Sequence, residues 1–210
     1  MRRAVAGIWD VQEPGVLPAL TVTAVCFFLG GLAGCLLAAQ VDGGGSESLA
    51  AYLEGFLQAS VDGAVETPGL PVLIWETVRW PLLAALLGFT ALGLFGLPVL
   101  FLTRGFLMGF SIAAFVRLFG SGGCLLAVLV FGVSGVFSLP ALFVLGVQSL
   151  VAARSLAGRF SGERRAPSPY GRAYFLRWGM CAGALFMCVV LEAFAVPALL
   201  AGAAGSFLGP

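Results

Sequence analysis

The chain has 210 residues, of which 60% are hydrophobic and 10% are charged, and its mean hydropathy is +1.05. A soluble domain of this length carries about twice that share of charged residues, so the composition excludes an ordinary soluble enzyme and favours a polytopic membrane protein. Histidine is absent, which removes the most frequent general base and metal ligand, and the five cysteines form no CxxC pair. We therefore expect a protein that is not an enzyme, with no catalytic residue, no metal and no cofactor.

The first apolar run, residues 16–39, is long enough to cross a bilayer of about 30 Å at about 1.5 Å per residue. Arg2 and Arg3 precede this run, and positive charge beside a first span favours a cytoplasmic N-terminus. The sequence therefore predicts a first span that leaves the cytoplasm.

The most acidic part of the chain, residues 40–77, follows this span, and we expect it to form a loop on the outer side of the membrane. From Ser48 to Ser60 apolar residues recur at helical spacing, which predicts an amphipathic helix on the outer face. Trp75 and Trp80 on either side of Arg79 are typical of the interface where a chain re-enters the membrane. The residues of this apolar face that form a candidate partner surface are Tyr52, Leu53, Phe56 and Leu57.

Arg104 lies between two apolar runs that are expected to be the second span, 78–102, and the third span, 105–119. A charged side chain at the centre of a bilayer costs at least about 2.5–3.5 kcal/mol. The sequence therefore predicts a tight turn at Thr103-Arg104-Gly105, in which Arg104 anchors the chain at the cytoplasmic boundary. Pro98 is expected to kink the second span.

The fourth span is expected at 124–151, after a glycine-rich turn at 120–123, and the fifth at 178–200. Between them, residues 152–177 contain six arginines and a single acid, Glu163, which favours a cytoplasmic loop. These features predict an all-α bundle of about five transmembrane spans in one membrane domain. Its N-terminus would lie inside and its C-terminus outside, in the cell membrane.

Three glycine pairs with GxxxG spacing occur in the expected spans. Small residues at this spacing let two helices approach closely, and they more often mark packing within a bundle than a dedicated dimer site. The pairs are Gly30 and Gly34, Gly105 and Gly109, and Gly179 and Gly183.

Few residues of the spans suggest chemistry. Residues 132–135 read GVSG, which matches the serine motif of rhomboid-type intramembrane proteases, but that mechanism needs a histidine to accept the serine proton. The candidate intramembrane polar positions are Arg104, Gln148 and Glu192. An ionisable group at such depth indicates an ion or solute path, or it pairs with an arginine and serves only helix assembly.

Several short segments are similar to one known family. They are residues 96–99 (GLPV), Arg104-Gly105, Gly109-Phe110, Leu139-Pro140-Ala141 and the outer segment 51–56 (AYLEGF). In these segments the chain resembles the stage II sporulation protein M family, integral membrane proteins of endospore-forming bacteria. It differs from the family at residues 135–138, where the family carries a further Pro and an Asn.

The resemblance implies a non-enzymatic membrane scaffold that organises peptidoglycan hydrolases, of the amidase and transglycosylase type, while the forespore is engulfed. Its expected partners are these hydrolases and membrane lipids, with a homo-oligomer left open and no nucleic acid. The intramembrane polar groups support an alternative, a transporter or channel subunit for ions or small solutes.

Overall fold

The computed structural model describes residues 15–40, 70–128, 132–160 and 172–207 of the chain. Within these ranges the regular secondary structure is entirely helical, which confirms the predicted all-α class. The described helices are α2 (Val16–Gln40), α4 (Leu70–Gly88), α5 (Gly93–Ala127), α6 (Val133–Phe160) and α7 (Arg172–Phe207).

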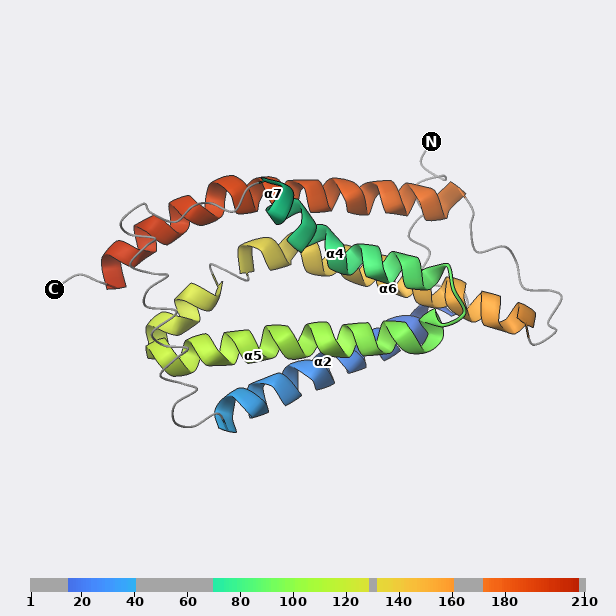
Figure 1. Ribbon diagram of the computed structural model, residues 1–210, viewed down its shortest axis with the longest axis horizontal. Helices are drawn as coiled ribbons and strands as arrows, with labels where there is room; N and C mark the ends of the chain where they lie inside the picture. Colours follow the sequence, from blue (N-terminus) through green and yellow to red (C-terminus); the bar gives the residue numbers. More distant parts are fainter. Residues whose placement is uncertain (1–14, 41–69, 129–131, 161–171, 208–210) are drawn as a thin grey trace.

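Successive helices run in opposite directions along the bundle (Figure 1). α2, α5 and α7 run one way, whereas α4 and α6 run the other way. The connection between α4 and α5 therefore lies at the same end as the start of α7, where the rings of Phe89 and Tyr174 meet at 6.5 Å. We call this the arginine-rich end, because Arg154, Arg172 and Arg177 belong to the adjoining ends of α6 and α7. We call the opposite side of the bundle, where α2 terminates, the far end.

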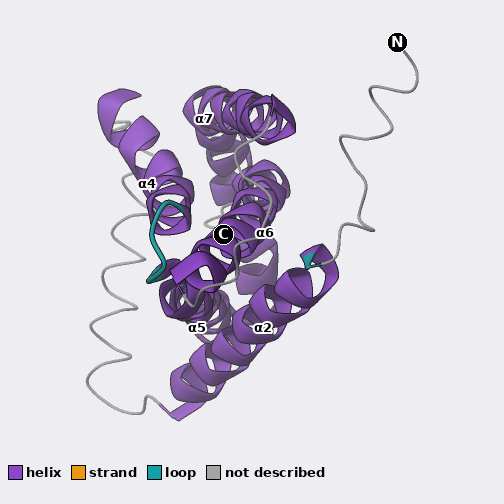
Figure 2. Ribbon diagram, turned by 90° about the vertical axis from the view of Figure 1, so that its right-hand side faces the viewer, coloured by secondary structure: helices purple, strands orange, loops and turns teal. Residues whose placement is uncertain are grey.

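α6 occupies the middle of the bundle. It contacts each of the other four described helices, and Figure 2 shows it between the α2–α5 pair and α7. Phe101 of α5 is fully buried against it, because Gly146 leaves room for the ring: a methyl group at Gly146 would lie 2.4 Å from the Phe101 ring atoms. Phe143 completes this core with its ring 5.0 Å from that of Phe101.

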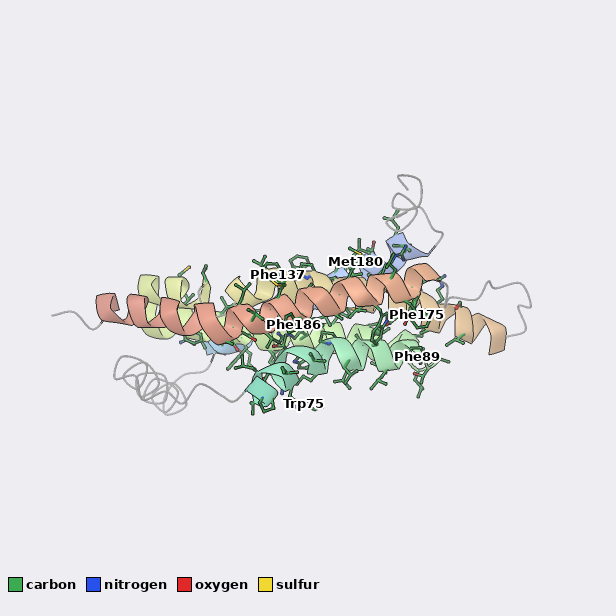
Figure 3. All side chains as sticks on the ribbon, turned by 90° about the horizontal axis from the view of Figure 1, so that it is seen from above. Trp75, Phe89, Phe137, Phe175, Met180 and Phe186 are labelled. Atoms are coloured by element: carbon green, nitrogen blue, oxygen red, sulfur yellow. The ribbon has the colours of Figure 1, made fainter. Side chains whose placement is uncertain are left out.

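Four helices of the described chain are long and apolar enough to cross a membrane: Val16–Gln40, Gly93–Arg117, Gly135–Gly158 and Tyr174–Ala193. Their outer faces are strongly apolar, since Phe95 is 76% exposed and Phe186 68% exposed. Figure 3 shows exposed apolar side chains of this kind along α4, α6 and α7. Such a surface is matched by lipid chains and poorly matched by water, so this is a membrane protein.

The tightest contact in the bundle joins the backbones of α2 and α5, which run in parallel. A methyl group at Gly30 would lie 2.0 Å from the carbonyl oxygen of Leu102, and one at Gly105 would lie 2.1 Å from that of Phe27. Gly34 and Gly109 allow equally close contacts one turn further along. These two GxxxG pairs therefore pack within the bundle, as predicted.

The third pair, Gly179 and Gly183, behaves differently. Nothing lies within 4 Å of a methyl group placed on either glycine, and both residues are exposed on α7. In the described chain this pair makes no close contact between helices.

The predicted turn at Thr103-Arg104-Gly105 is wrong. α5 runs without a break through these residues, and the Thr103 hydroxyl donates a hydrogen bond to the Val99 carbonyl within the same helix, at 2.9 Å. The chain reverses at 89–92 instead, where the amide of Gly93 donates to the Thr90 carbonyl at 3.1 Å. A charged residue does not end a helix, whereas the glycines at 88 and 93 on either side of this connection do favour a break.

Other boundaries also shift from their expected positions. α4 begins at Leu70, within the expected outer loop, and α6 and α7 extend into the expected basic loop, which leaves only 161–171 between them. Pro98 and Pro140 lie inside α5 and α6. The expected break at 120–123 is present as a kink within α5, where Gly120 has φ 57° and ψ −130°, a conformation that only glycine adopts readily. The expected amphipathic helix from Ser48 to Ser60 lies outside the described residues.

We predict that Gly30→Leu lowers the stability of the protein by about 1–3 kcal/mol or more, because the new side chain would force α2 away from the Leu102 carbonyl. The free energy of unfolding can be measured by SDS titration in mixed micelles, followed by far-UV circular dichroism. Gly179→Leu is the matched control, since it makes the same chemical change at a position with open space around it. Equal losses in the two variants would contradict the assigned role of the α2–α5 contact.

Candidate functional site

Arg104 lies near the middle of a helix segment that is long and apolar enough to cross a membrane. It is the twelfth residue of the 25-residue span Gly93–Arg117. Eleven residues of helix rise about 16 Å from Gly93, which is about half the thickness of the hydrocarbon layer. The predicted turn that would place Arg104 at the cytoplasmic boundary is absent because α5 is continuous there, and in a membrane-spanning α5 its guanidinium must be accommodated inside the bundle.

The nearest support for this guanidinium is the indole ring of Trp80 on α4. The Arg104 Cζ atom lies 5.5 Å from the ring centroid, and the Cζ atom of Arg79 lies 5.8 Å from the same ring. A cation near an aromatic ring is stabilised by about 0.5–2 kcal/mol, with the larger value where water is excluded. Trp80 thus interacts with two arginines, one from its own helix and one from α5.

Two carboxylates complete a group that we call the charged cluster: Glu76, Arg79, Arg104 and Glu192. Glu76 and Arg79, one turn apart on α4, form an ion pair at 2.9 Å. Glu192 of α7 accepts a hydrogen bond from the Thr77 hydroxyl, also at 2.9 Å. The cluster joins α4, α5 and α7 and has two charges of each sign.

The charges within the cluster are not matched pair by pair. The guanidinium groups of Arg104 and Arg79, which carry like charges, approach the same Trp80 ring. Within the described part of the chain no carboxylate lies within the 4.0 Å of an ion pair with Arg104. Glu192 contacts Thr77, so the expected pairing of Glu192 with an arginine is not formed among these residues.

A small cavity lies next to Arg104 between α5 and α6. Its volume is about 80 Å³, and its walls include Arg104, Met108 and Ser111 from α5 with Gly135, Ser138 and Leu139 from α6. This space accommodates a few water molecules or one small charged group. The arginine and the two serine hydroxyls make it a site suited to an anionic group.

Gln148, another of the predicted polar positions, is not part of this cluster. Gly93 and Ala153 lie at the same level, since a methyl group at Gly93 would be 3.0 Å from the Ala153 Cβ atom. At about 1.5 Å per residue, Gln148 lies about 7 Å from this level along α6, whereas Arg104 lies about 16 Å from it along α5. Gln148 is only 9% exposed, and neither atom of its side-chain amide has a hydrogen-bond partner among the described residues.

Sequence reasoning placed Arg104 and Glu192 among the polar positions but did not associate Glu76, Thr77 and Arg79 with them. The signal was present in Pro71, because proline is favoured in the first turn of a helix and so places the start of α4 near Leu70. A start at Leu70 puts Glu76 and Arg79 in one helix at pairing distance. The predicted partner surface, formed by Tyr52, Leu53, Phe56 and Leu57, lies outside the described residues.

A sequence model of the family described as stage II sporulation protein M matches residues 23–197, which is more than half of the chain. The chain belongs to the stage II sporulation protein M family. This confirms the resemblance noted from the sequence, and it identifies the protein as a membrane protein of a sporulation family. Neither the comparison with curated proteins nor that with solved structures gave a match. The matched region contains all four residues of the charged cluster.

We predict that Thr77→Val in this sporulation-family protein lowers the free energy of unfolding by about 0.6–1.7 kcal/mol, the range of hydrogen bonds between membrane helices. The substitution keeps the shape of the side chain but removes the donor to Glu192. Thr103→Val is the matched control, because the Thr103 hydroxyl bonds only to its own helix on an exposed face. A loss in the control as large as that in Thr77→Val would show that the contact with Glu192 adds no stability.

Proposed function

We propose that this protein is a non-enzymatic membrane scaffold that organises peptidoglycan hydrolases during engulfment of the forespore. The observation that carries the proposal is the family match, which extends over residues 23–197 and so includes most or all of every described helix. A scaffold needs a stable body in the membrane and a segment that reaches its partners. The close α2–α5 contact supports the first requirement.

The second requirement points to residues 41–69, between α2 and α4. α2 ends at the far end of the bundle, away from the arginine-rich end (Figure 1). Arginine-rich segments remain in the cytoplasm, so the far end would face the cell wall. In this arrangement α4 also crosses the cell membrane and brings the number of spans to five. The N-terminus of the protein then lies inside and its C-terminus outside. The side where wall hydrolases act is then also the side of the predicted partner surface, Tyr52, Leu53, Phe56 and Leu57.

Arg117 is the described arginine that this orientation places near the outer side. Its guanidinium donates a hydrogen bond to the Ala38 carbonyl, at the C-terminal end of α2. A cation at this position satisfies a free carbonyl and interacts favourably with the helix dipole. Arg117 therefore has a local structural role and does not count against the proposed orientation.

A second candidate function, transport of ions or small solutes, is favoured by the charged cluster and the cavity beside Arg104. The two functions differ in what the cluster does. In a transporter it would exchange partners during each cycle, whereas in a scaffold it holds helices together. The hydrogen bond from Thr77 to Glu192 joins α4 to α7 and supports the role of holding helices together.

We predict that a tagged copy, isolated from sporulating cells after cross-linking, recovers a cell-wall amidase and a transglycosylase-type hydrolase. Tyr52→Ala with Phe56→Ala should reduce their recovery at equal protein abundance, because it removes the apolar face of the outer segment. Phe95→Ala with Phe186→Ala is the control, since these two aromatic side chains are exposed on the membrane helices.

Absence of both hydrolases from the unmodified protein's complexes would contradict the scaffold proposal. Measurable flux of an ion or a small anion across liposomes that contain the purified protein, abolished by Arg104→Leu, would favour the transporter instead.

A further inference from the structure

Arg104 forms no direct ion pair within the described bundle, although the charged cluster around it has two charges of each sign. Glu76 is paired with Arg79 at 2.9 Å, and Glu192 is bound by Thr77. A cation in a medium of low dielectric constant is costly unless an anion is close to it. Trp80 offsets part of this cost, but a ring quadrupole does not replace a carboxylate.

The space next to this guanidinium is open at its edge. Leu107 lines the cavity and is 43% exposed, and Phe137, the neighbour of Ser138 on the other wall, is also exposed (Figure 3). The walls carry the small residues Ser111 on α5 and Ser138 on α6, whereas Gly135 is buried and faces Met108. Small side chains along a groove let the backbone of another helix approach closely. The cavity therefore opens on the exposed apolar surface of α5 and α6, and we call this opening the groove between α5 and α6.

The depth of Arg104 decides which anion can reach it. The guanidinium belongs to a residue about 16 Å along α5 from Gly93, near the middle of the hydrocarbon layer. A phospholipid phosphate lies at the membrane surface and is separated from this depth by about half the hydrocarbon thickness. A carboxylate carried by a membrane-spanning helix is the anion that reaches this depth without disturbing the bilayer.

We propose that the groove between α5 and α6 binds a transmembrane helix of a partner protein, through an Asp or Glu that lies at mid-depth and pairs with Arg104. The carboxylate would enter the cavity of about 80 Å³, where the hydroxyls of Ser111 and Ser138 supply further donors. This inference deepens the proposed scaffold function and rests on it, because it assigns the membrane body of the protein a role in holding a membrane-anchored partner.

The test uses a synthetic probe, a helix of Leu and Ala residues with a single Glu at its centre, and an otherwise identical peptide with Gln. The full-length protein, labelled with a fluorescent donor, is reconstituted in phosphatidylcholine vesicles, and energy transfer to acceptor-labelled peptide gives the affinity. We expect the Glu peptide to bind about tenfold more tightly than the Gln peptide, as for one polar contact of about 1.4 kcal/mol in a membrane.

Two variants separate the charge from the groove. Arg104→Gln should abolish the preference for Glu over Gln, and Ser138→Leu should weaken binding of both peptides because its side chain would fill the cavity without changing any charge. Arg154→Gln is the control with the same loss of charge, and it should preserve the preference, since Arg154 is exposed near the end of α6 and belongs neither to the charged cluster nor to the groove. Circular dichroism establishes that each variant is folded.

Equal binding of the two peptides to the unmodified protein would overturn the proposal, and so would a preference for Glu that survives Arg104→Gln, or binding of both peptides that Ser138→Leu does not weaken. Loss of the preference when phosphatidylglycerol replaces phosphatidylcholine would show that a lipid phosphate occupies the site. Energy transfer between two copies of the protein, unchanged when the Glu peptide is added, would show that a second copy occupies it. Either result would also overturn it. A clear preference for the Glu peptide, with no hydrolase recovered from cells, would support helix binding by the groove and contradict the scaffold function.

Discussion

The close backbone contact between α2 and α5 fixes the position of a charged residue along the bundle, and the arrangement around it follows from that position. Gly105 lies against the Phe27 carbonyl and Gly109 against Gly31, so α5 cannot slide along α2 without losing both contacts. Arg104, next to Gly105, is thereby held near the middle of the candidate span Gly93–Arg117. The cost of a charge at this depth is several kcal/mol, and α4 and α7 bring the residues that offset it.

A charged residue at this position has a physical explanation if its charge binds a partner. Apolar packing would stabilise the same position more simply, because a buried charge gives little net stability even when it is paired. A charge does, however, discriminate strongly between partners with and without a matching group. The proposed scaffold would have to select its partners within the membrane as well as outside it, and Arg104 beside the groove would meet the first need.

The sequence was sufficient for the first helix and the packing of two glycine pairs, since both depend on local pattern: the expected 16–39 agrees with α2, and Gly30 and Gly105 face partner backbones. The sequence-based prediction failed at Arg104, because it considered the cost of the charge for an isolated helix. The compensation comes from Trp80 and Glu192, which are remote in sequence and brought close only by the fold. The partners of a buried polar group cannot be predicted from its own helix.

The most direct test of the depth of Arg104 is the reactivity of single cysteines toward a membrane-impermeant maleimide, in a protein whose five native cysteines are replaced. Leu102→Cys and Leu107→Cys flank Arg104 at exposed positions of α5, and Thr90→Cys lies in the connection before it. We expect the two α5 positions to remain unlabelled in intact and in permeabilised cells, and Thr90→Cys to react only after permeabilisation. Labelling of Leu102→Cys and Leu107→Cys as rapid as that of Thr90→Cys would place Arg104 at the membrane boundary and contradict this description of the bundle.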